Sequence, residues 1–125
     1  MKSKLELYAL SVCFASVVCL VVSAGIGGFS IVEIIAPELT MSSYKYDKYQ
    51  TNETFWKDAC SKDEAAGNKP GAEVLTKQRT EEFAVEITAE RREGFQTLVR
   101  CLMFILASGT ALLVHWNIAK KARAD

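Results

Sequence analysis

Residues 7–36 read LYALSVCFASVVCLVVSAGIGGFSIVEIIA, a run of 30 positions in which Glu33 carries the only charge. An α-helix rises 1.5 Å per residue, so about 20 apolar residues already cross the hydrocarbon core of a bilayer. The run therefore predicts a membrane-spanning helix with turns to spare. Pro37 follows it directly, and because proline lacks a backbone donor and disfavours helical geometry before it, we expect the helix to end there.

A second apolar stretch, residues 97–118, is interrupted only by Arg100 and His115. Two such stretches predict an all-α membrane protein: a two-span transmembrane helical hairpin with a helical extramembrane lobe between the spans. The expected parts, in chain order, are an N-terminal tail at 1–6, a first span at 7–36, the lobe at 37–96, a second span at 97–118 and a basic C-terminal tail at 119–125.

The charges at the two ends of the chain predict its orientation. Both tails are short and basic, so the positive-inside rule places both in the cytoplasm and the lobe outside it. A plasma membrane or bacterial inner membrane is the expected location. A cleaved signal peptide is the alternative, since Val22-Ser23-Ala24 resembles a cleavage site. The apolar run continues to residue 36, however, which favours an uncleaved span.

Within the lobe, Gly67-Asn68 and Pro70-Gly71 predict a turn at the tip. After the tip, strong helix formers predict one long helix from about residue 74 through the second span to about residue 121. A short helix capped by Thr51 or Asn52 is expected before the tip. Three tyrosines follow the first span: Tyr44, Tyr46 and Tyr49. Tyrosines just beyond a span are typical of an interfacial aromatic belt, and a ligand-binding aromatic cluster is the alternative.

Small residues recur every fourth position along the first span. Positions four apart lie on one helix face, where small side chains let another helix approach closely. We therefore expect a helix-packing stripe of Ser11, Ala15, Cys19, Ser23 and Gly27, against either the second span or another copy. The second span has its own small face at Ala107, Ser108 and Ala111.

Charges near the spans offer two further hypotheses. Glu33 and Arg100 form a possible ion pair, because ionisable groups in or near a membrane usually have a partner. The long helix also carries a row of carboxylates spaced three or four residues apart: Glu82, Glu86, Glu90 and Glu93. Because like charges at this spacing repel one another, we expect something to neutralise them. Either lobe lysines such as Lys45 pair with the row, or the row is a face that binds a cation or a basic partner.

The composition removes several functional classes. Lys plus Arg and Asp plus Glu are equal at 15 each, so no basic footprint for nucleic acid exists. His115, the single histidine, has no cluster of other ligands around it, so neither a metal nor another cofactor is expected. Since no triad, phosphate loop or nucleophile elbow appears, an enzyme is not expected. Cys60, the lone lobe cysteine, is either a free thiol or bridges two chains.

The sequence thus predicts a non-catalytic assembly, accessory or regulatory subunit whose immediate surroundings are the lipid bilayer. It would associate through helix packing, as a homo-oligomer or within a larger membrane complex, and expose the helical lobe to a partner. The alternative is an oligomeric two-span channel or pore. Against the pore, neither span shows a continuous polar face or a recognisable selectivity sequence.

Overall fold

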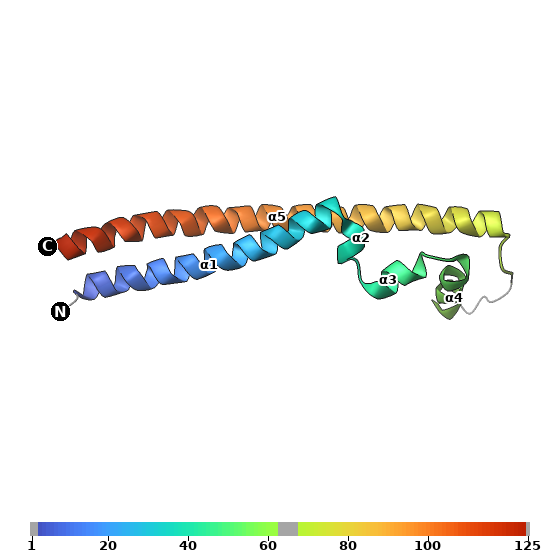
Figure 1. The fold of residues 1–125 in the computed structure, drawn as a ribbon, viewed down its shortest axis with the longest axis horizontal. Helices are drawn as coiled ribbons and strands as arrows, with labels where there is room; N and C mark the ends of the chain where they lie inside the picture. Colours follow the sequence, from blue (N-terminus) through green and yellow to red (C-terminus); the bar gives the residue numbers. More distant parts are fainter. Residues whose placement is uncertain (1–2, 63–67, 125) are drawn as a thin grey trace. The chain divides into compact units, whose positions relative to one another are not determined.

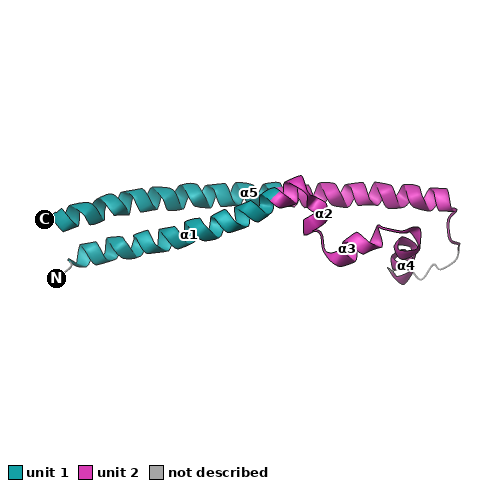
Figure 2. Cartoon of the chain, in the orientation of Figure 1, with its two compact units in different colours: residues 1–31, 95–125 teal, residues 32–94 magenta. Residues whose placement is uncertain are grey.

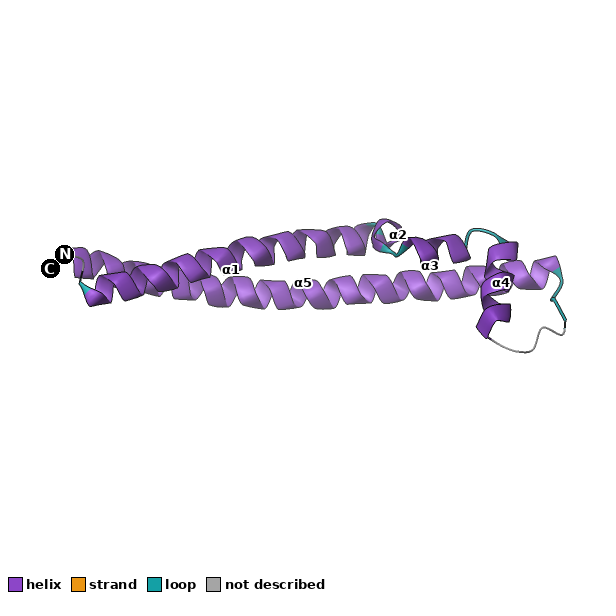
Figure 3. Ribbon diagram, turned by 90° about the horizontal axis from the view of Figure 1, so that it is seen from below, coloured by secondary structure: helices purple, strands orange, loops and turns teal. Residues whose placement is uncertain are grey.

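The computed structural model describes residues 3–62 and 68–124 and contains five helices in that part of the chain. In chain order they are α1 (Lys4–Ile35), α2 (Pro37–Thr40), α3 (Ser43–Lys48), α4 (Asn52–Lys62) and α5 (Ala72–Ala124), shown in Figure 1. No strand occurs within these described ranges, as Figure 3 illustrates. The all-helical prediction is confirmed. The expected tip turn falls partly on residues 63–67, outside the described residues.

Helix α1 ends where the sequence predicts. The Ala36 amide donates the last helical hydrogen bond, 2.7 Å to the Val32 oxygen, and Ala36 itself has left helical geometry at φ −134°. Pro37 then opens α2, where a missing amide hydrogen removes no helical bond. Next along the chain, the Ser42 side chain caps α3 by accepting a hydrogen bond from the Lys45 amide.

Helix α5 is continuous over 53 residues. It extends the predicted helix by two or three residues at each end, within the usual fraying of helix boundaries. It contains no proline, and Gly94 is the one glycine in its first 23 residues, 72–94. Both α1 and α5 contain a segment long and apolar enough to cross a membrane.

The chain divides into two compact units, coloured separately in Figure 2. We call residues 1–31 and 95–125 the two-helix unit and residues 32–94 the lobe unit. Helix α5 contributes its C-terminal part to the first and its N-terminal part to the second.

In the two-helix unit, α1 and α5 lie side by side and antiparallel, as Figure 1 shows. The residues that α1 buries recur at spacings of three, four or seven: Glu6, Ala9, Cys13, Ser16, Ser23, Gly27 and Ser30. This is a heptad pattern, in which every third or fourth residue faces a partner helix. With one exception, Glu6, all of these side chains are small.

Helix α5 presents a matching row, which is buried or half-buried: Leu98, Cys101, Ile105, Ser108, Leu112, His115 and Ala119. Two contacts define the register. A methyl group added to Gly27 would lie 3.5 Å from the Cys101 Cβ atom, and the Cys13 Sγ atom lies 4.0 Å from the Leu112 oxygen. Small side chains on α1 therefore lie against a mixed row on α5, in which Leu98, Ile105 and Leu112 are the large apolar members. We call this contact the seam.

Polar contacts close the seam at the end where both termini lie. Arg123 Nε donates to Glu6 Oε1 at 3.2 Å, and the Glu6 carboxylate is buried beneath it. The rings of Tyr8 and His115 meet edge to face, with centroids 5.9 Å apart. His115 Nδ1 lies 2.8 Å from the Ala111 oxygen, which ties the ring to its own helix.

The lobe unit has a small aromatic core. Tyr49, Phe55 and Leu75 are its buried members, and Trp56 and Phe83 pack against them. Polar contacts surround the core. The Arg79 guanidinium donates to the backbone oxygen of Gln50 at 2.6 Å, and the side-chain amide of Asn52 donates to the Thr76 hydroxyl at 2.9 Å. These bonds fasten the α3–α4 segment to the start of α5.

The predicted tyrosine belt is divided among three environments. Tyr49 belongs to the lobe core, Tyr44 donates a hydrogen bond to Asp58, and Tyr46 is exposed. The Asp58 carboxylate is buried and also pairs with Lys48 at 3.2 Å. The Lys48 ammonium in turn lies over the rings of Tyr49 and Phe55, which links α3, α4 and the core.

Candidate functional site

The first candidate site is a groove along one side of the two-helix unit, with a volume of about 480 Å³. Both helices line it, and most of the lining side chains are small. From α1 and α5 respectively, they are Tyr8, Ser11, Val12, Ala15, Ser16, Cys19, and Ala107, Ser108, Ala111. The small face predicted for the second span thus borders the same groove as the first part of the predicted stripe.

The five residues of that stripe separate into two groups. Ser23 and Gly27 are buried in the seam, whereas Ser11, Ala15 and Cys19 are exposed and line the groove. The geometry explains the division. A row spaced by four drifts slowly around a helix, while the seam alternates spacings of three and four and stays on one face.

The groove is apolar despite its hydroxyl groups. Ser11 Oγ donates to the Leu7 oxygen at 2.9 Å, and Ser16 Oγ donates to the Val12 oxygen at 2.8 Å. Each serine therefore satisfies its donor within its own helix and offers mainly a small surface to a neighbour. Many exposed side chains outside the groove are bulky, among them Phe14, Val21, Leu106 and Leu113, although Ala24, Gly25 and Gly28 are also exposed there.

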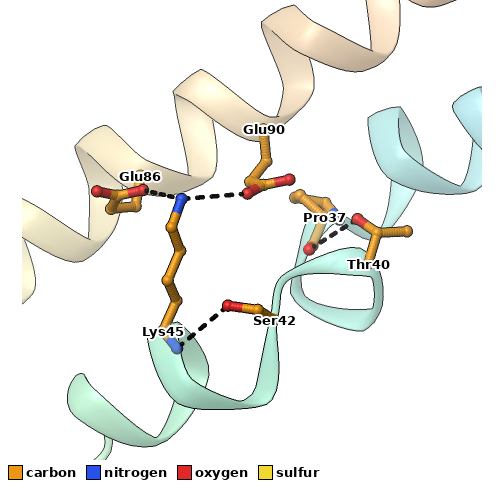
Figure 4. A network of polar contacts seen from close by, with 6 residues as sticks. All are labelled: Pro37, Thr40, Ser42, Lys45, Glu86 and Glu90. Carbon is orange, nitrogen blue, oxygen red and sulfur yellow. Dashed lines mark hydrogen bonds and ion pairs between the residues drawn. The ribbon is translucent and has the colours of Figure 1, made fainter.

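The second candidate site is the carboxylate row of α5 in the lobe unit. Lys45 lies between two members of that row, with its Nζ atom 3.1 Å from Glu86 Oε2 and 3.6 Å from Glu90 Oε1 (Figure 4). Figure 4 also shows the Ser42 cap that holds the start of α3 and so positions Lys45. One of the lysines expected to neutralise the row therefore does so.

The pairing has an electrostatic consequence for Lys45. The hydrogen bond to Glu86 and the charge of that carboxylate raise the pKa of the Lys45 ammonium above its usual value, against a smaller opposing effect of burial. A raised lysine pKa means that the folded lobe holds this proton more tightly than the unfolded chain. The contribution to stability is complete at neutral pH and is lost only as the pH rises past the ordinary lysine range.

Glu33 lies in the lobe unit beside two other carboxylates. One oxygen atom from each of Glu33, Glu90 and Glu93 falls within 4.8 Å of the others. Glu82 lies apart from this group and is exposed. Arg100 belongs to the two-helix unit and is also exposed, so its proposed pairing with Glu33 concerns two different units and stays a prediction.

Sequence reasoning missed two features of these sites. The seam was detectable, because Ala9, Cys13 and Ser16 already show the alternation of three and four. The burial of Asp58 was not detectable, because nothing in the neighbouring sequence distinguishes it from an exposed aspartate.

Cys60 is half-buried and, like the three other cysteines of the described chain, is not in a disulfide.

Comparison with known proteins finds no matching family, no matching characterised protein and no matching solved structure. The function is therefore argued from the geometry of the chain itself.

Proposed function

We propose that this chain is a two-span integral membrane protein that acts as a non-catalytic assembly, accessory or regulatory subunit. The proposal has three parts: insertion of α1 and the C-terminal part of α5 in a bilayer, association through the groove, and an extramembrane lobe offered to a partner.

Membrane insertion is supported by the distribution of side chains in the two-helix unit. Phe14 is 72% exposed and Phe104 62% exposed, while the residues that α1 buries are, apart from Glu6, small. Such a distribution suits an apolar solvent, because lipid gives large apolar side chains no reason to leave the surface. The basic residues beside the two outer ends support a cytoplasmic location for both termini in a plasma or bacterial inner membrane.

Topology can be tested by labelling introduced cysteines in a variant whose native cysteines are serine. Lys69→Cys lies in the exposed part of the lobe and Lys120→Cys in the C-terminal tail. A membrane-impermeant maleimide added to intact cells should label the first and leave the second unlabelled until the cells are permeabilised. The reverse pattern would place the lobe in the cytoplasm and contradict this orientation.

Association through the groove is the part that carries the functional proposal. In lipid, helices associate where small residues let their backbones come close. The groove collects such residues from both helices on one side of the pair, whereas many of the exposed residues elsewhere are bulky. A third helix can approach closely on this side, whether it comes from a second copy or from a larger membrane protein.

Native mass spectrometry of the full chain in mild detergent tests this part. Ala15→Phe fills the groove, and Val21→Phe is the matched control because Val21 is 67% exposed outside it. The first substitution should shift the population towards the monomer or strip a co-purifying subunit, and the control should not. Equal spectra for both variants would contradict association through the groove. A homogeneous larger ring that conducts ions in liposomes would instead identify a pore.

The lobe is the proposed contact outside the membrane. Lys45 already neutralises part of the carboxylate row, which leaves Glu82 and Glu93 as its exposed members. A basic partner surface would complement them. If it does, Glu82→Gln combined with Glu93→Gln should weaken retention of the co-purifying subunit, most visibly at low salt, while the fold of the lobe is unchanged by circular dichroism.

A further inference from the structure

We draw no further inference here: the strongest candidate, the carboxylate cluster of Glu33, Glu90 and Glu93 in the lobe unit, is a group of acidic side chains at which no second observation among the described residues points to a bound cation.

Discussion

The two units of this protein bury opposite kinds of side chain. In the lobe unit the large residues lie inside, with Phe55 at 4% and Leu75 at 1% exposure. In the two-helix unit the small residues lie inside, and phenylalanines such as Phe14 lie at the surface. The hydrophobic effect accounts for the first arrangement, since burial removes apolar area from water. It provides no force for the second when lipid is the solvent.

The difference shows which forces hold each unit together. The lobe depends on aromatic burial, reinforced by ion pairs and hydrogen bonds around its rim. Under the proposed membrane insertion, the two-helix unit would depend on close approach along the seam, where dispersion contacts between the small residues of α1 and the α5 row replace burial of area. Truncating a buried side chain should therefore matter most in the lobe unit, and enlarging one should matter most in the two-helix unit. The first two of four measurements test this contrast, and the other two test the lobe ion pairs and the closeness of the seam.

Truncating a lobe aromatic residue should have the largest effect. Phe55→Ala removes a core ring and should destabilise the lobe by ~3–5 kcal/mol, the usual cost of a buried phenylalanine. Phe14→Ala is the matched control, because Phe14 is exposed in the folded two-helix unit and, under the proposed membrane insertion, would stay in lipid when the helices separate. Hydrogen exchange of the full chain in detergent should show faster exchange in the lobe for the first variant alone. A comparable loss of protection in Phe14→Ala would remove the contrast between the units.

Enlarging a seam residue should have the next largest effect. Ser23→Leu forces a branched side chain between α1 and α5 and should cost ~1–3 kcal/mol, as overpacking does in closely packed interiors. Val22→Leu changes the adjacent exposed position and should be nearly neutral. Helix separation can be followed by energy transfer between labels on the two helices during titration with a denaturing detergent. If the two variants separate at the same detergent concentration, α1 does not face α5 along this seam.

Removing the Lys45 ion pairs should have a modest effect confined to the lobe. Lys45→Met should cost ~0.2–1 kcal/mol at low salt, the usual range for partly exposed pairs. The loss should shrink as salt is added, since screening weakens the pairs in the wild type. Because contact with Glu86 raises the Lys45 pKa, the wild type should keep the contribution at neutral pH and lose it in strong alkali.

The control for Lys45→Met is Lys77→Met, which removes an exposed lysine of the same helix-rich lobe. Thermal unfolding of both variants at two salt concentrations makes the comparison. A salt response that is the same for both variants would show that the contacts to Glu86 and Glu90 contribute nothing measurable.

Replacing Gly27 by alanine should have the smallest effect and the opposite sign. The added methyl group would lie 3.5 Å from Cys101 Cβ, an ordinary van der Waals distance. Alanine also favours the helix over glycine by up to ~1 kcal/mol, which stabilises α1 itself equally in the associated and separated states. Gly27→Ala should therefore leave helix association unchanged or slightly stronger, and Gly25→Ala, which meets no neighbouring atom, should match it. Clear weakening in Gly27→Ala alone would mean that the helices approach more closely than this seam allows.

Much of the fold was predictable because its causes are local. The length of an apolar run, a proline after it and an unbroken series of helix formers set the bounds of α1 and α5, and the structure places those ends within a few residues of the expected positions. The pairing of Lys45 with the carboxylate row was also foreseeable, since the first arm of the lobe carries lysines that an antiparallel second arm can bring beside its glutamates.

The sites were predictable only in part. The stripe of small residues was identified as a packing surface, yet its members serve two surfaces: Gly27 lies in the seam and Ala15 in the groove. Likewise Tyr49 was expected at a membrane interface and lies in the lobe core. Periodicity assigns a residue to a face of its own helix, but the rotation of that helix against its neighbour decides what the face meets.

The sequence alone therefore determined that this is a helical chain with two apolar segments and a charged region between them, because each of those properties is set by neighbouring residues. Tertiary structure alone decided which small residues are enclosed and which remain open to a partner, that Asp58 is buried against Tyr44 and Lys48, and that Glu33 lies beside two like charges. Those outcomes depend on the register between segments far apart in the chain, and no single segment contains that information.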